Sequence, residues 1–132
     1  MKVVVDTNVL MSGIFWGGVP GKILDLWSER RFSLVISESI FNEYKRVAGI
    51  LESKYQFKSA NKILDIIAIG SAFVDPKGVK HPHCDDPDDD QFLAAAVYSH
   101  AKYIVSGDKA LLRVAKYPGG TVVTAQSFIE LF

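Results

Sequence analysis

The chain lacks several features that would mark whole classes of protein. Its single cysteine, Cys84, has no second thiol to pair with, so an internal disulfide is excluded and a reducing cytoplasm is the expected location. No apolar run approaches the roughly 20 residues that a membrane-spanning helix needs. The sequence begins directly with an expected strand rather than with a charged leader. We therefore expect neither a targeting segment nor a membrane partner.

A net charge is also absent, because 15 Lys and Arg residues balance 15 Asp and Glu residues. Without a global positive field, nucleic acid can be bound only through local patches, so the charge balance neither supports nor excludes RNA as a substrate. The sequence has no internal repeat and no low-complexity segment. A chain of 132 residues can bury a sufficient core by itself, and we assign residues 1–132 to one domain.

Short β-branched runs alternate with segments of helical periodicity along the whole chain. Strands are expected at residues 3–5, 33–36, 72–74, 103–106 and 121–123. Helices are expected at about 20–31, from after Ser37 to Leu51, at about 59–69, 87–100 and 109–116, and after Thr124. The helix after Ser37 is expected to break at Gly49 if it breaks at all. The segment from Phe15 to Gly18 is expected to be a mobile loop. This alternation is typical of an α/β fold in which helices cover both faces of a parallel sheet.

Two acidic residues follow expected strands. Asp6 ends the run 3–5, and Asp108 follows the run 103–106 after a single glycine. Open α/β sheets bind their ligands at the carboxyl ends of their strands, so both side chains are expected at the binding edge.

Two further acids share the inward stripe of an expected helix. Glu43 lies three residues after Ile40 and four before Val47, and Asp90 lies three residues before Leu93. Carboxylates that face inward together are costly unless a cation or a donor compensates them. Mg²⁺ or Mn²⁺ would compensate all of them, because such ions prefer oxygen ligands and can activate water for hydrolysis.

Each acid also has a purely structural interpretation. Asp6 and Asp108 are well placed to cap helices that begin at the next residue, which is a common use of aspartate. Glu43 is equally compatible with a solvated helix face, and Asp90 with an acidic first turn that suits the helix dipole. These interpretations stay open at the level of the sequence.

Several stretches together resemble a PIN domain. They are residues 3–10, 36–44, 86–96 and 104–112, and residues 123–131 resemble the last strand and helix of that family. The resemblance implies a three-layer α/β/α fold with a central parallel sheet of about five strands. It also implies a divalent-metal-dependent endoribonuclease that uses Mg²⁺ or Mn²⁺.

Carried over position by position, the acidic catalytic and metal-binding positions of the family fall on Asp6, Glu43, Asp90 and Asp108. Asp90 is chosen among neighbouring aspartates because it stands just before the Phe-Leu-Ala-Ala run. Thr7 and Asn8 fall where the family often has a small hydroxyl residue or an asparagine, and the resemblance implies that they orient Asp6 or a metal-bound water. The resemblance further implies the toxin of a prokaryotic toxin–antitoxin pair (VapC-like), an RNA substrate, an antitoxin partner and a homodimer.

Other interpretations compete with a nuclease. A receiver domain would need an acid pair after the first strand, and a haloacid-dehalogenase-like phosphatase would need a second aspartate where Asn8 stands. A PIN-like module without catalysis, used for RNA binding or assembly, keeps the fold and differs only in metal binding. His81, His83 and Cys84 are candidate ligands of a zinc ion, although no further Cys or His lies nearby in sequence to complete a four-ligand site.

Some neighbouring side chains are candidates for contacts with RNA. Lys109, Lys45 and Arg46 lie close in sequence to the acids and are either phosphate contacts or solvated charges. Phe15 and Trp16 are candidates for stacking on bases and equally for core or dimer contacts.

Overall fold

The computed structural model describes residues 1–55 and 60–132. Within these residues, six strands form one sheet in which β1 is an inner strand. The strand order is β3-β2-β1-β4-β6-β5. The strands are β1 (Lys2–Val5), β2 (Ser33–Ser37), β3 (Ala72–Val74), β4 (Tyr103–Val105), β5 (Lys116–Tyr117) and β6 (Gly120–Val123). Five strands are parallel, as predicted, and the short β5 adds an antiparallel edge that the sequence did not reveal.

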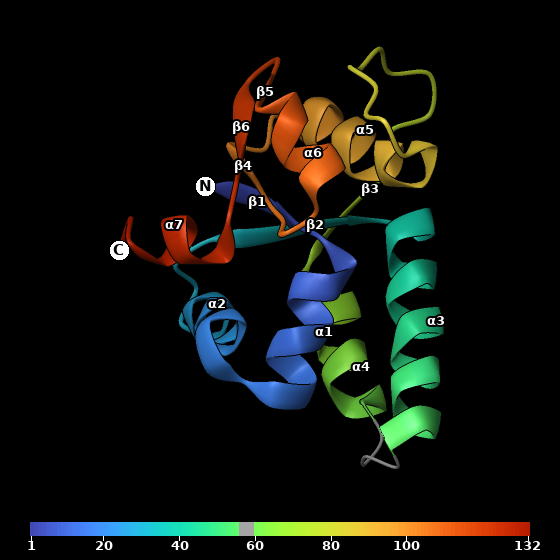
Figure 1. Cartoon of the computed structure of the whole chain (residues 1–132), viewed down its shortest axis with the longest axis vertical. Helices are drawn as coiled ribbons and strands as arrows, with labels where there is room; N and C mark the ends of the chain where they lie inside the picture. The colour runs from blue at the N-terminus through green and yellow to red at the C-terminus, as the bar shows by residue number, and fades with distance from the viewer. Residues whose placement is uncertain (56–59) are drawn as a thin grey trace.

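Helices cover both faces of this sheet (Figure 1), which confirms the predicted α/β/α architecture. They are α1 (Thr7–Trp16), α2 (Gly18–Ser28), α3 (Glu38–Tyr55), α4 (Asn61–Gly70), the 3₁₀ turn η1 (Pro87–Asp89), α5 (Asp90–Ser99), α6 (Lys109–Val114) and α7 (Ala125–Ile129). Figure 1 shows α5 and α6 on one side of the sheet and α1, α2 and α4 on the other, with α3 running beside α1 and α4. In the residues that the structure describes, no helix is both long enough and apolar enough to cross a membrane.

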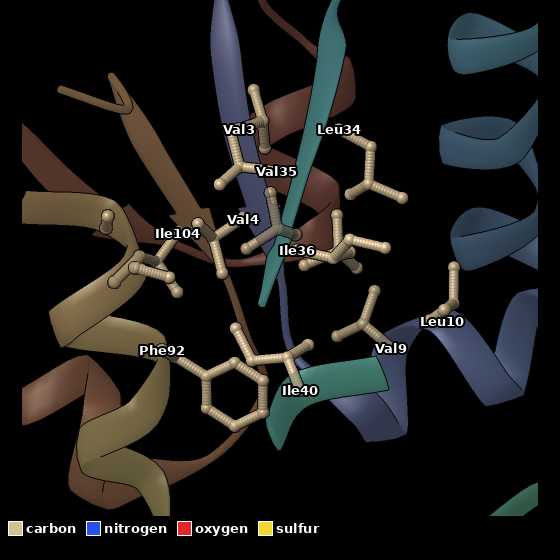
Figure 2. Close-up of a cluster of buried hydrophobic side chains, with 14 of the residues drawn as sticks. Val3, Val4, Val9, Leu10, Leu34, Val35, Ile36, Ile40, Phe92 and Ile104 are labelled. Carbon is tan, nitrogen blue, oxygen red and sulfur yellow. The ribbon is translucent and has the colours of Figure 1, made fainter. Parts of the chain in front are cut away.

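The core forms where the β-branched strands meet the helices. Val4 of β1 and Ile36 of β2 have no exposed surface. Figure 2 shows such strand residues in one cluster with Ile40 from α3 and Phe92 from α5. Burying an aliphatic side chain of this size is worth about 1.5–3 kcal/mol, so these contacts hold α3 and α5 against the same sheet.

The predicted loop at residues 15–18 is wrong. Phe15 and Trp16 are the last residues of α1, and α2 begins at Gly18. Gly17 alone separates the two helices, with φ of 72°, which is a conformation that glycine adopts without the strain of a side chain. Phe15 and Trp16 therefore lie at the end of α1 that is remote from Asp6.

Helix α3 is also longer and more regular than expected. It continues through Gly49 to Tyr55 without a break. A glycine costs about 1 kcal/mol in a helix interior, but Ile40, Tyr44 and Ala48 are buried on one stripe and hold the helix in place. The helix predicted at about 59–69 is α4, which begins at Asn61, and residue 59 lies outside the described residues.

Two further predicted helices have different ends. The helix expected over 87–100 consists of η1 followed by α5, which ends at Ser99. Asp86 caps η1 by accepting a hydrogen bond from the Asp88 N–H. The helix expected over 109–116 ends at Val114, because Ala115 has φ of 63° and the next residues join the sheet as β5.

The parallel pairing of β1 with β4 positions the candidate site. Val5 lies opposite Val105, so the residues that follow the two strands emerge next to each other at one sheet edge. The chain leaves β1 toward β2 on one side, while β4 pairs on the other side of β1. Such a reversal of strand order is where open α/β sheets form a crevice for ligands.

Candidate metal centre

Asp6 is buried at the carboxyl end of β1. It has 4% of its surface exposed, and its backbone N–H donates to the Val105 carbonyl at 2.9 Å. Although Asp6 occupies the N-cap position of α1, its side chain makes no capping hydrogen bond. Its Oδ2 instead accepts a hydrogen bond from the Ser106 hydroxyl at 2.7 Å. Burial raises the pKa of Asp6, and repulsion from Asp108 and Glu43 adds to this effect.

Asp108 is tied to the same point through Ser106. The Asp108 backbone N–H donates to Ser106 Oγ at 2.9 Å. Its own Oδ1 accepts from the Ala110 N–H at 2.7 Å and from the Leu111 N–H at 3.4 Å, so the capping interpretation is correct for this oxygen. Ser106 has no exposed surface and thus connects the two acids that follow β1 and β4.

Glu43 approaches from α3 and is held by neutral donors. The Thr7 hydroxyl donates a hydrogen bond to Glu43 Oε2, and Gln91 Nε2 donates to Oε1 at 3.3 Å. Arg46 lies one helical turn further, with Nη2 at 3.9 Å from Oε1 and a side chain that is 63% exposed. The Thr7 hydroxyl therefore orients Glu43, whereas the sequence suggested Asp6 or a metal-bound water as its partner.

Tyr44 fixes α3 against the end of β1. Its side chain is fully buried, and its hydroxyl donates to the Val5 carbonyl at 2.5 Å. Burial raises the pKa of this phenol, with further contributions from Asp6 and Glu43. The hydrogen bond spans 39 residues of sequence and brings the neighbouring Glu43 to the edge where Asp6 lies.

Asp89 adds a further carboxylate at this edge. Its Oδ2 is buried and has no hydrogen-bond partner among the described residues. Partial burial raises the pKa of Asp89 to about 7, and repulsion from Asp6, Asp108, Asp86 and Glu43 adds to the shift. Asp89 therefore carries a buried oxygen whose charge no donor among the described residues compensates.

Asp90 faces a different part of the protein. Its Oδ2 lies 2.8 Å from His83 Nδ1, and its Oδ1 accepts from the Cys84 backbone N–H at 2.9 Å. Partial burial alone raises the pKa of Asp90, but these two contacts hold it below its usual range. The structure thus brings together Asp6, Glu43 and Asp108 of the four predicted residues and places Asp89 beside them instead of Asp90.

A cavity of about 220 Å³ opens between these acids. Its lining residues come from the ends of β1 and β4, the start of α1, the middle of α3 and the turn before α5, and they are Asp6, Thr7, Asn8, Glu43, Arg46, Val47, Asp86, Asp88, Asp89 and Asp108. Six of these ten side chains are carboxylates and one is a cation. The cavity is consequently a site of negative charge.

The donor set suits a hard divalent cation. Carboxylate oxygens are the ligands that Mg²⁺ and Mn²⁺ prefer, and the buried, unpaired Asp89 Oδ2 is an atom that such an ion would satisfy. In the described residues, however, no group of three or more Asp, Glu, His or Cys side chains already stands in a metal-binding arrangement. Binding by Asp6, Asp89 and Asp108 therefore requires side-chain movement.

The three residues of the suggested zinc site make other contacts. His83 contacts Asp90, His81 Nδ1 lies 2.7 Å from the Pro82 carbonyl, and the Cys84 thiol donates to the Asp86 carbonyl at 2.8 Å. These contacts organise the loop that precedes η1.

Three residues of the site were not identified from sequence. Asp89 was hidden among neighbouring aspartates, Ser106 was assigned only to a strand, and Gln91 gave no signal. The position of Ser106 at the end of an apolar strand, two residues before Asp108, was the one available indication. A buried hydroxyl between two acids follows from that position only when β1 and β4 are known to be neighbours.

The opposite pKa shifts of Asp89 and Asp90 predict opposite effects of pH on stability without metal. Between the unfolded pKa of about 3.9 and the folded pKa of about 7, the folded state binds more protons at Asp89, so its charge destabilises the fold as pH rises. In EDTA, Asp89→Asn should raise the melting temperature at pH 8 by roughly 3 °C, allowing for solvent screening of a partly exposed group, and should have little effect at pH 4.5.

Asp90→Asn is the matched control. Because the folded pKa of Asp90 is lowered, its stabilising contribution is present above the unfolded pKa and is lost as pH falls. The substitution should lower the melting temperature at pH 8. Scanning calorimetry measures both variants, and destabilisation by Asp89→Asn at pH 8 would contradict the placement of Asp89.

Comparisons with known proteins agree with this fold. An uncharacterized protein of Methanocaldococcus jannaschii is 38% identical over 120 residues, which cover 85% of this chain and 74% of that protein. One chain of the crystal structure of VapBC2 from Rickettsia felis, bound to a DNA fragment from its promoter, superposes with a TM-score of 0.61 at 16% identity. The superposition covers 94% of this chain and 98% of that chain. At this identity the likeness shows a shared fold.

The family comparison covers most of the chain. The model of the PIN domain matches residues 2–110, a range that includes all the acids of the cavity. With this match and the relative at 38% identity, the chain belongs to the PIN domain family.

Proposed function

We propose that this protein is a divalent-metal-dependent endoribonuclease that hydrolyses phosphodiester bonds of RNA. The observation that carries the proposal is the meeting of Asp6, Glu43, Asp89 and Asp108 at one sheet edge, with a buried Asp89 oxygen that has no donor among the described residues. Membership of the PIN family supports the same chemistry, since PIN domains are generally nucleases.

The proposed metal ligands are Asp6, Asp89 and Asp108, with Glu43 beside them. A bound Mg²⁺ or Mn²⁺ would supply Lewis acidity and offset the negative charge that develops on phosphate oxygens during hydrolysis. The protein residues provide the positions: Ser106 orients the Asp6 carboxylate, and Thr7 and Gln91 orient Glu43. Arg46 stands at the rim of the cavity, where a guanidinium can contact a phosphate.

Substitution of single acids tests this assignment. Asp6→Asn and Asp89→Asn should each reduce cleavage of a single-stranded RNA, in Mg²⁺ or Mn²⁺, by more than the roughly 10- to 100-fold typical of residues that only support a metal ligand. Asp90→Asn changes the same chemical group one residue away and should retain nearly the wild-type rate, because its carboxylate faces His83. The rate of release of a fluorescent fragment measures all three.

The possible outcomes separate the competing interpretations. Loss of activity with Asp90→Asn but not with Asp89→Asn would show that Asp90 is the ligand, as the sequence resemblance implies. Wild-type rates for both Asp6→Asn and Asp89→Asn would contradict the nuclease site. A wild-type protein that binds RNA without cleaving it would favour the PIN-like module without catalysis.

We further propose that the protein is the toxin of a toxin–antitoxin pair, works in the cytoplasm, is masked by a small antitoxin and forms a homodimer. The shared fold with a chain of the VapBC2 structure supports this context. Helix α4 also exposes an apolar stripe that a protein partner would cover, with Ile63, Ile66 and Ile69 exposed by 38%, 57% and 87%.

Expression in bacteria tests the toxin proposal. The wild-type chain should stop growth, whereas Asp6→Asn should be tolerated, and light scattering of the purified Asp6→Asn protein should give twice the 14.6 kDa mass of one chain. Growth at the normal rate at confirmed expression levels would contradict the toxin role, and a mass of one chain at micromolar concentration would contradict the homodimer.

A further inference from the structure

A larger cavity adjoins the acidic one. It has a volume of about 720 Å³, and its lining includes the first two turns of α1, the turn before α6 and α6 itself. Asn8, Asp86 and Asp108 line both cavities, so the two share a boundary. A volume of this size is in the range of sites that hold organic ligands of nucleotide size.

The charges in the larger cavity are separated along its length. Its acids, Asp86 and Asp108, are both at the boundary shared with the acidic cavity. Beyond them the lining includes Lys109 and Arg113, which are exposed and four residues apart on α6 and therefore project from the same face of the helix. The surface thus changes from anionic at the proposed cleavage site to cationic along α6.

Arg113 forms an ion pair with Asp85 that a ligand can displace. Its Nη2 lies 3.2 Å from Asp85 Oδ2, and the two side chains are 64% and 77% exposed. Ion pairs this open to solvent are typically worth less than about 1 kcal/mol. A phosphate group, which offers bidentate acceptors to a guanidinium, can therefore displace Asp85.

We propose that this cavity, which we name the α6 groove, binds the sugar–phosphate backbone of single-stranded RNA on one side of the scissile bond. Lys109 and Arg113 each contact a phosphate, and Asp85 restrains Arg113 until RNA enters. The inference rests on the proposed function, because it places the RNA relative to the acidic cavity. It adds the direction in which the strand leaves that cavity, past Asn8 and along α6.

Binding without cleavage isolates the groove from the chemistry. In EDTA, Lys109→Ala and Arg113→Ala should each weaken binding of a fluorescent 12-nucleotide RNA by about three- to fivefold. Each should also reduce the steepness of log K against log salt concentration by about 0.7, the value for one lost phosphate contact on a single strand. The matched control is Lys102→Ala, since Lys102 is exposed but immediately precedes β4, at the opposite sheet edge.

Substitution of Asp85 should change the RNA affinity in the opposite direction. Asp85→Asn should strengthen RNA binding by about twofold or more, because it releases Arg113 and removes a negative charge. Asp65→Asn removes another exposed negative charge, from α4, and should have a smaller effect. Equal effects of the two substitutions would overturn the restraining role of Asp85.

If Lys109→Ala and Arg113→Ala both bind RNA with wild-type affinity and wild-type salt dependence, the proposal that the α6 groove binds RNA is overturned. An acidic peptide that binds the wild type but not these variants, with RNA affinity unchanged, would assign the groove to a protein partner and overturn the proposal as well. Failure of the nuclease proposal looks different: RNA is bound through Lys109 and Arg113, but it stays intact when Mg²⁺ or Mn²⁺ is added. If the protein cleaves RNA but the variants bind it as the wild type does, the nuclease proposal is supported and RNA binding in the α6 groove is overturned.

Discussion

Electrostatic repulsion among carboxylates at the carboxyl edge of β1 and β4 is the constraint on which the rest of this site depends. Asp6 is almost completely buried, and Asp89 has a buried oxygen with no donor among the described residues. Such an arrangement costs stability in the absence of a cation, because burial and mutual repulsion both oppose ionisation. A fold retains that cost only where the surrounding elements hold the groups together.

Those elements are held by neutral contacts rather than by countercharges. Ser106 connects Asp6 and Asp108, Thr7 and Gln91 hold Glu43, and the Tyr44 hydroxyl attaches α3 to the last residue of β1. Hydroxyl and amide donors orient carboxylates without cancelling their charge, so the negative potential stays available for an ion. Arg46, the one cation that lines the acidic cavity, is largely exposed and sits at its rim.

Much of the fold could be predicted from the sequence, because its strands are short β-branched runs that suit a strand and are too short to form a helix. Asp6 and Asp108 could be placed because each follows such a run, and Glu43 because the stripe of α3 is long and regular. Asp89 could not be distinguished from Asp90 by periodicity. Asp90 is the first residue of α5 and keeps the α-helical spacing to Leu93, but its carboxylate contacts His83 and Cys84 instead of the acidic cavity. Asp89 lies in the preceding 3₁₀ turn, whose angle per residue differs from that of the stripe. These contacts depend on how the loop before the turn folds, which helical periodicity does not predict.

A crystal structure of the protein soaked in Mn²⁺, recorded with anomalous scattering, tests most directly whether these acids form a metal site. We expect an anomalous peak among the carboxylates of Asp6, Asp89 and Asp108, with Asp90 still in contact with His83. A map with no peak between these acids at saturating Mn²⁺, or with the ion bound at His83 and Asp90 instead, would show that the acidic cavity is not the metal site.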